Sequence, residues 1–171
     1  MKMNNRLILM MGVPGCGKSY FAAKLAKWIP NTEIISRDEI RFKMLQSNDE
    51  YFKHEKQVFQ AFILAINENL AAGHNVIVDA THINRQSRSK VLREINHDYY
   101  NRCDIFYMRT PIGRCIAQNN LREGRAKVPE KVVKDFWNRK KTPILDEGFD
   151  NIYYVFDCER ISLVQGKDEA I

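Results

Sequence analysis

Short apolar runs alternate along the chain with segments in which apolar residues recur every three or four positions. Short apolar runs bounded by polar residues are typical of buried strands, and three- and four-residue spacing is typical of helices that pack on one face. The predicted strands cover residues 7–11, 33–36, 75–79, 103–108 and 152–156. The predicted helices cover residues 18–28, 58–70 and about 84–96, with further helices starting near residues 38, 111 and 129.

The alternation of these elements predicts an α/β fold, in which a parallel sheet of about five strands is covered by helices on both faces. With 171 residues, 44% of them hydrophobic, the chain is long enough for one core, so a single domain over residues 1–171 is expected. The second helix is expected to turn Ile40, Met44 and Leu45 inward, and the tail after Cys158 is expected to be peripheral.

The composition indicates where the protein is located and which partners it favours. No run of about 18 apolar residues occurs, so no membrane span is predicted. The four cysteines lie far apart without C-x-x-C spacing, which favours reduced thiols in a cytoplasmic protein over a zinc site or a disulfide framework. The excess of 27 basic over 21 acidic residues favours polyanionic partners such as nucleotides or nucleic acid.

The stretch between the first strand and the first helix, GVPGCGKS at residues 12–19, fits G-x-x-x-x-G-K-[ST] without a mismatch. Glycines let successive backbone N–H groups turn toward phosphate oxygens, Lys18 reaches the β- and γ-phosphates, and Ser19 offers a hydroxyl to Mg²⁺. The alternative is a glycine-rich turn that binds nothing. The residues expected to bind ATP here are Gly12, Pro14, Gly15, Cys16, Gly17, Lys18, Ser19 and Tyr20.

Phosphoryl transfer to a hydroxyl needs a carboxylate that takes the proton, and Asp38 follows the second strand at a suitable place. A carboxylate that merely caps a helix would look identical in the sequence. Arg41 lies one helical turn further and could orient an anionic group on the acceptor, the alternative being an ordinary surface arginine. Arg37 precedes Asp38 and is included in the predicted acceptor site.

Asp79 ends the apolar run 76–78, so it is expected at the carboxyl edge of the sheet, where open α/β sheets bind ligands. It is predicted to hold a water on the Mg²⁺ ion that Ser19 also binds, the alternative being an aspartate in an ordinary turn. Thr81 and His82 follow it and are predicted near the acceptor.

A basic segment around Gly124 carries Arg122, Arg125 and Lys127. A loop with such charges could close over the triphosphate and stabilise the transition state, whereas most basic loops are simply solvated. Arg122 is favoured over Arg125 as the residue that contacts phosphate and contributes to catalysis.

Five stretches together resemble a known family: GVPGCGKS, SRDEIR at 36–41, VIVDATHIN at 76–84, LREGRAKVP at 121–129 and P-x-x-x-E-G-F-D at 143–150. They are similar to the P-loop kinase group that contains bacteriophage polynucleotide kinase and zeta-toxin-like kinases. The resemblance implies a three-layer P-loop NTPase fold with a helical lid, ATP and Mg²⁺ as cofactors, Asp38 as the general base toward a 5′-hydroxyl, and Arg41 on the 3′-phosphate of the terminal nucleotide. Asn119 and Asn120 depart from the family, whose members often have an additional arginine there.

The first functional hypothesis is therefore an ATP-dependent polynucleotide 5′-hydroxyl kinase, with the end of DNA or RNA as its partner. A kinase of a small hydroxylated metabolite or nucleotide-sugar is the second hypothesis. The third is a binding module that hydrolyses ATP slowly, which the pair formed by Asp38 and Arg41 disfavours, because a pure switch needs no such pair.

Overall fold

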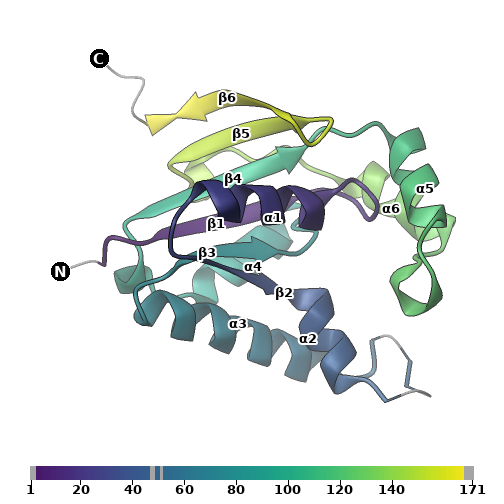
Figure 1. The fold of residues 1–171 in the computed structure, drawn as a ribbon, viewed down its shortest axis with the longest axis horizontal. Helices are drawn as coiled ribbons and strands as arrows, with labels where there is room; N and C mark the ends of the chain where they lie inside the picture. Colours follow the sequence, from purple (N-terminus) through teal and green to yellow (C-terminus); the bar gives the residue numbers. More distant parts are fainter. Residues whose placement is uncertain (1–2, 47–48, 51, 168–171) are drawn as a thin grey trace.

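The computed structural model describes residues 3–46, 49–50 and 52–167. A sheet lies at its centre, and helices cover both faces (Figure 1). The strands are β1 (Arg6–Met11), β2 (Thr32–Ser36), β3 (Asn75–Asp79), β4 (Arg102–Met108), β5 (Asn151–Phe156) and β6 (Arg160–Gly166). The α-helices are α1 (Lys18–Trp28), α2 (Arg37–Met44), α3 (Glu55–Ala71), α4 (Arg85–Glu94), α5 (Ile112–Asn120) and α6 (Glu130–Arg139). Three 3₁₀ turns, η1, η2 and η3, cover His97–Tyr99, Gly124–Ala126 and Leu145–Glu147.

The sheet has the strand order β2-β3-β1-β4-β5-β6, and its first five strands are parallel. These five strands confirm the prediction. The last strand, β6, pairs antiparallel with β5 and was not predicted, because the tail after Cys158 was expected to be peripheral. Its apolar residues Leu163 and Val164 are exposed, so β6 lacks the pattern of a buried strand.

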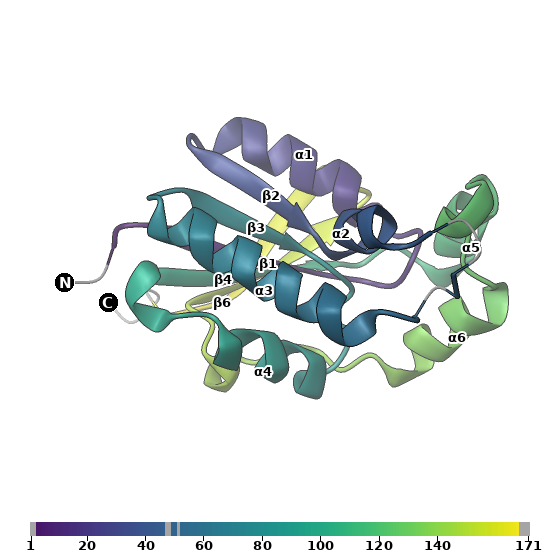
Figure 2. The ribbon, with the colours of Figure 1, turned by 90° about the horizontal axis from the view of Figure 1, so that it is seen from below.

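Two apolar clusters form the core, one on each face of the sheet. Even positions of β1 such as Ile8 and Met10 pack with α1, while odd positions such as Leu7 and Leu9 pack with α3 and α4. Figure 2 shows α1 separated from α3 and α4 by the strands. A strand buried on both faces reads as a continuous apolar run, which is why β1 was recognisable in the sequence.

Helix ends follow the expected signals. Asn84 caps α4 in a capping box with Ser87, and Ser36 accepts a hydrogen bond from the amide of Glu39 at the start of α2. Gly73, with φ of +91°, follows the end of α3 as predicted.

The buried face of α2 differs from the prediction. Met44 is 38% exposed and was wrongly expected to point inward, whereas Arg41 is the buried residue of this helix. The reason is that α2 packs against α3, where a carboxylate receives the guanidinium of Arg41, while Ile40 of the same helix packs against the apolar core.

A buried ion pair between α4 and η3 holds the segment that follows β3. Arg88 of α4 is fully buried and donates two hydrogen bonds of 2.7 Å to the carboxylate of Glu147. Its third nitrogen donates to the carbonyls of His82 and Lys141 at 3.1 and 3.0 Å. Because each donor has a partner, this charge is tolerated inside the core and fixes the segment after β3.

None of the helices in the described ranges is both long and apolar enough to cross a membrane.

Candidate functional site

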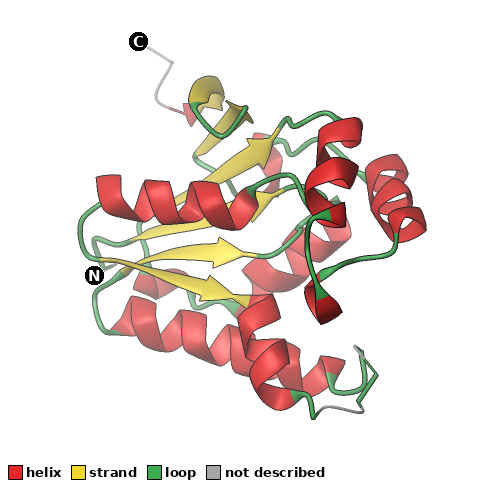
Figure 3. Ribbon diagram, turned by 45° about the vertical axis from the view of Figure 1, so that its right-hand side comes forward, coloured by secondary structure: helices red, strands yellow, loops and turns green. Residues whose placement is uncertain are grey.

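The carboxyl ends of the parallel strands point toward the side of the molecule where α2, α5 and α6 gather (labelled in Figure 1 and seen from another side in Figure 3). The chain leaves β1 there, forms the loop 12–17 and enters α1 at Lys18. Gly15 and Gly17 have φ of +81° and +90°, a region that side chains disfavour. A Cβ atom on Gly15 would lie 2.1 Å from the carbonyl oxygen of Cys115, so this glycine is needed for close packing as well as for its backbone angle.

The loop offers hydrogen-bond donors to an anion. Within the described ranges, the N–H groups of Gly15 and Gly17 donate no hydrogen bond, and the first turn of α1 adds its own N–H groups beside them. The Lys18 ammonium donates to the carbonyls of Gly12 and Val13 at 2.9 and 3.1 Å, which folds it back over the loop. This donor set fits the phosphates of a nucleotide.

Neighbouring segments hold the loop in shape. The amide of Gly12 donates to the carbonyl of Thr81 at 3.0 Å, and the buried hydroxyl of Thr110 donates to the carbonyl of Cys16 at 2.8 Å. The turn between β5 and β6 also approaches, because a Cβ atom on Gly17 would lie 2.5 Å from the sulfur of Cys158. The predicted ATP-binding stretch is thus braced by segments that follow β3, β4 and β5.

Ser19 and Asp79 lie together, as the sequence analysis expected. The Ser19 hydroxyl donates a 2.7 Å hydrogen bond to Oδ2 of Asp79, which is 6% exposed at the end of β3. Hydroxyl and carboxylate oxygens are ligands that suit Mg²⁺, so this pair fits the ion that accompanies ATP. Tyr20, the next predicted contact, is 63% exposed on the outer face of α1, where the Lys24 ammonium lies 5.6 Å from the centre of its ring.

A second set of charges lies on α2. Asp38 is exposed, whereas the side chain of Arg41 is only 5% exposed, and the two form an ion pair one turn apart. Strand β2 aligns Ser36 with Asp79 of β3, so α2 starts directly beside the carboxylate of the proposed metal site. The structure therefore brings the predicted acceptor residues and the predicted metal ligands to one edge of the sheet.

Glu55, the first residue of α3, is the charged residue that sequence reasoning missed. Its carboxylate receives Nη2 of Arg41 at 3.0 Å and also forms an ion pair with Arg37. The Arg37 guanidinium lies 5.4 Å from the ring centre of Phe59 on the same helix. One carboxylate thus orients both arginines. The sequence signal was weak, because a glutamate in the first turn of a helix is common.

His82 is buried beside the end of β1. Its Nδ1 lies 2.7 Å from the carbonyl oxygen of Met10, and its φ is +44°. Burial of the ring lowers the pKa of His82 to about 4, so the ring is neutral at physiological pH. A neutral ring that donates from Nδ1 leaves Nε2 as an acceptor, and this buried atom has no hydrogen-bond partner among the described residues. Contact of Thr81 or His82 with an acceptor stays a prediction.

The basic segment connects α5 and α6 through η2. The buried side chain of Asn119 joins the two ends of this segment. Its amide group donates to the carbonyl of Val128 at 2.6 Å and accepts from the backbone N–H of Val128 at 3.1 Å. Arg122 is exposed and reaches the carbonyl of Ala126 at 3.4 Å. Arg125 donates to the carbonyl of Gln46, just after α2, at 2.6 Å. The two arginines therefore face different surroundings.

Comparison with known proteins identifies the fold and the family. Human 6-phosphofructo-2-kinase/fructose-2,6-bisphosphatase 1 is 26% identical over 156 residues, which cover 78% of this chain and 32% of the human protein. A chain in the Pnkp1/Rnl/Hen1 RNA repair complex is similar with a TM-score of 0.65 and 20% identity over 81% of this chain and 45% of that chain. A sugar kinase from Janibacter sp. HTCC2649 matches with a TM-score of 0.62 and 18% identity over 90% and 85% of the two chains.

The chain spans less than half the length of the human relative and of the matched chain in the repair complex. The two structural likenesses show a shared fold. The family described as AAA domain matches residues 7–143, which include the phosphate loop, α2, β3 and the basic segment. This chain belongs to that family, AAA_33, and is a P-loop kinase domain.

Proposed function

We propose that this P-loop kinase is an ATP-dependent polynucleotide 5′-hydroxyl kinase, which moves the γ-phosphate of ATP to the 5′-hydroxyl end of DNA or RNA. The observation that carries the proposal is the alignment of β2 with β3, Ser36 beside Asp79. It brings the exposed carboxylate of Asp38 to the site that would hold the metal and the triphosphate. An acceptor hydroxyl held by Asp38 would then face the γ-phosphate.

Each residue has a distinct role in the proposed reaction. Lys18 and the loop amides bind the β- and γ-phosphates, and Ser19 and Asp79 hold Mg²⁺. Asp38 takes the proton of the acceptor hydroxyl as its oxygen forms a bond to the γ-phosphorus. The bond from that phosphorus to the bridging oxygen of ADP breaks, and Arg122 stabilises the charge on the transferred group.

The acceptor chemistry is supported by Arg41. Its guanidinium is held by Asp38 and Glu55, so an acceptor phosphate bound there would fix the hydroxyl relative to Asp38. The likeness to a chain from an RNA repair complex also supports a nucleic-acid acceptor.

A small hydroxylated metabolite is the second candidate acceptor. The human relative is a 6-phosphofructo-2-kinase/fructose-2,6-bisphosphatase by name, and a sugar kinase shares the fold. A phosphate carried by a sugar could use Arg41 in the same manner as the 3′-phosphate of a nucleotide.

A panel of acceptors distinguishes the two candidates. The chain is incubated with γ-labelled ATP and 5′-hydroxyl oligonucleotides of DNA or RNA, nucleosides, nucleoside 3′-phosphates, sugars and sugar phosphates. The polynucleotide proposal expects label on oligonucleotides and nucleoside 3′-phosphates. Faster labelling of a sugar or sugar phosphate would reject it in favour of the second candidate.

Asp38→Asn tests the general base within the same panel. The substitution keeps the shape but removes the proton acceptor, so the rate should fall by about 10²- to 10⁴-fold while ATP binding is retained. Glu39→Gln, on the neighbouring exposed carboxylate, is the matched control and should react normally. A loss below about tenfold in Asp38→Asn would show that Asp38 is not the general base and serves only its ion pair with Arg41.

A further inference from the structure

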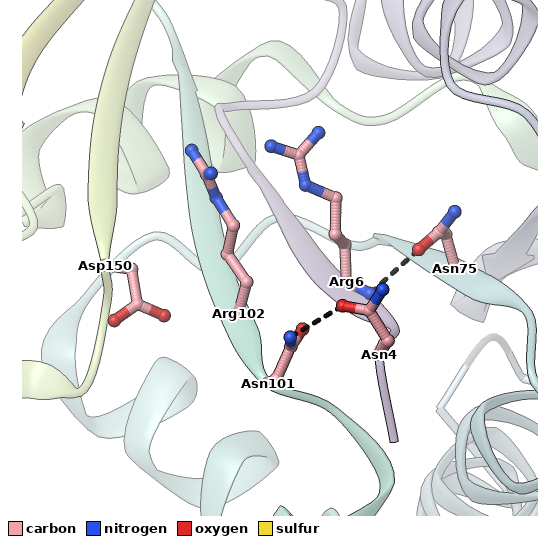
Figure 4. A pocket seen from close by; sticks show the side chains of 6 residues that line it. All are labelled: Asn4, Arg6, Asn75, Asn101, Arg102 and Asp150. Atoms are coloured by element: carbon pink, nitrogen blue, oxygen red, sulfur yellow. Dashed lines mark hydrogen bonds between the residues drawn. The ribbon is translucent and has the colours of Figure 1, made fainter. Parts of the chain in front are cut away.

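A polar pocket lies at the opposite edge of the sheet, where the parallel strands begin (Figure 4). Its volume is about 560 Å³, within the range of roughly 300–1,000 Å³ that is typical of small-molecule sites. The residues that line it are Asn4, Arg6, Asn75, Asn101, Arg102 and Asp150. None of them belongs to the kinase site, which lies at the carboxyl ends of the same strands.

Two arginines dominate this pocket. Arg6 begins β1 and Arg102 begins β4, and the parallel register pairs these two residues directly. Figure 4 shows their guanidinium groups side by side and pointing the same way from neighbouring strands. Like charges placed opposite each other on adjacent strands repel, so the arrangement needs an anion between or beside them.

Among the described residues, only one carboxylate is hydrogen-bonded or ion-paired to the two guanidinium groups, although Asp150 also feels the charge of Arg102. Asp104 is buried, accepts from Nε of Arg102 at 2.9 Å and lies 4.0 Å from Nη2 of Arg6. Its other oxygen accepts from the amide of Asn151 at 2.8 Å. Within the described ranges, the Arg6 guanidinium donates no hydrogen bond, so its donors remain available to a ligand.

The remaining charges of the pocket cancel. Asp150 accepts from the Lys167 ammonium at 2.8 Å and from the amide of Cys103 at 2.7 Å. With Asp150 and Lys167 neutralising each other, Arg6, Arg102 and Asp104 leave one positive charge in excess. A singly charged oxyanion would balance it, and guanidinium groups bind phosphate oxygens two at a time.

Amide groups would bind the rest of such a ligand. Asn4 and Asn101 lie at the base of the arginines and are joined by a 2.8 Å hydrogen bond, while Asn75 accepts from the amide of Arg6 at 2.8 Å. These contacts fix the side chains that line the pocket before any ligand binds, which lowers the entropic cost of binding. The volume exceeds what a phosphate alone would fill, so the phosphate would be the anchored group of a larger molecule.

We propose that this pocket is a second phosphate-binding site, in which Arg6 and Arg102 hold the phosphate group of a nucleotide or of a nucleic-acid strand. It is distinct from the proposed kinase site, and its existence does not depend on which acceptor the kinase uses.

The side-chain Nε–H signals of arginine, followed by NMR in the full chain, report on the pocket directly. The phosphate loop is first saturated with a non-hydrolysable ATP analogue and Mg²⁺, and Arg6→Gln assigns the Arg6 signal. Inorganic phosphate, AMP and a 5′-hydroxyl, 3′-hydroxyl oligothymidylate are then titrated separately. The proposal expects saturable shifts of the Arg6 and Arg102 signals with a Kd of about 1 mM or tighter for at least one probe.

The probes separate the two sources of the phosphate. Tight binding of AMP alone assigns a phosphorylated small molecule, and tight binding of the oligonucleotide, which carries only phosphodiesters, assigns a nucleic-acid strand. If the Arg6 and Arg102 signals do not shift with any probe, or if their shifts stay linear to high probe concentration, the arginines serve only Asp104 and the proposal is overturned.

Variants provide the second readout, which is the affinity of the selected probe. Arg6→Gln should weaken it by at least about tenfold, and Arg6→Lys should restore only part of the loss, because the charge remains but the two-pronged contact does not. Arg93→Gln removes the same charge from an exposed position on α4 and is the control. Equal affinities in Arg6→Gln and Arg93→Gln would reject the site. Arg6 is substituted in preference to Arg102, because its removal leaves Asp104 paired with Arg102. Turnover at the kinase site should stay unchanged in Arg6→Gln.

Discussion

The Ser19 hydroxyl donates a 2.7 Å hydrogen bond to Oδ2 of Asp79, which joins the first turn of α1 to the end of β3. A hydroxyl keeps acceptor lone pairs when it donates its proton. Ser19 could therefore bind Mg²⁺ through its oxygen while it remains hydrogen-bonded to Asp79. On this geometry the two residues act as one unit, and neither should be able to replace the other.

Ser19→Ala and Asp79→Asn should each lower kcat by at least about 10²-fold, because each disturbs the position of the metal on the triphosphate. The double variant should be little worse than the more damaged single variant, since residues that act as a unit are not additive. Steady-state kinetics at saturating ATP measures this. Ser162→Ala, on exposed β6, is the control for a lost hydroxyl, and multiplicative losses in the double variant would contradict the shared role.

Arg41→Ala should selectively slow acceptors that carry a 3′-phosphate, by about tenfold or more, since a two-pronged contact is lost. Glu55→Gln should reduce the same preference to a smaller degree, because Arg41 keeps its charge but loses the carboxylate that orients it. The measurement is kcat/KM for a nucleoside 3′-phosphate relative to the plain nucleoside. Glu68→Gln, an exposed glutamate on the same helix, is the control. An equal slowing of every acceptor would favour a structural role for the pair.

The sequence predicted the phosphate loop and the residues after β2 and β3 because these depend on local signals. A glycine-rich turn between an apolar run and a helix is typical of a phosphate-binding loop, and the carboxyl ends of parallel strands meet at one edge. The proximity of Ser19 to Asp79 follows from those two rules together.

Glu55 and β6 could not be predicted in the same way. Glu55 is paired with Arg41 only because α2 packs against α3, and no spacing in the sequence encodes that packing. Strand β6 lies at the edge of the sheet and exposes Leu163 and Val164, so it has no buried periodicity. The inward orientation expected for Met44 was wrong for a related reason, since the buried face of α2 carries Arg41, which pairs with Glu55 of α3.

Arg122→Ala should lower kcat more than it weakens ATP binding, because the exposed Arg122 is expected to contact charge that develops during transfer. A loss of about 10²-fold or more in kcat is expected. Arg125→Ala is the comparison, since Arg125 contacts the carbonyl of Gln46 and connects the basic segment to the end of α2. If only Arg125→Ala impairs transfer, Arg125 and not Arg122 contacts the phosphates.

Buried His82 makes the stability of the fold depend on pH. Burial lowers the pKa of His82 to about 4, below its ordinary value of 6.5, so the unfolded chain binds a proton that the folded chain excludes. Its contribution to stability is therefore complete above about pH 6.5 and is lost as the pH falls toward 4. Each pH unit within this window costs up to about 1.4 kcal/mol.

His82→Asn should remove this dependence on pH. The backbone at residue 82 has φ of +44°, and asparagine adopts positive φ more readily than most residues, so the fold should be kept. Urea unfolding at about pH 7.5 and about pH 5 gives the free energy of unfolding for each protein. The wild type should lose about 2 kcal/mol more than His82→Asn between the two conditions. His74→Asn, at a partly exposed histidine, controls for the loss of one imidazole. Equal losses in the wild type and His82→Asn would show that the ring of His82 is protonated in the folded protein, and the assignment of Nε2 as a neutral buried acceptor would then fail.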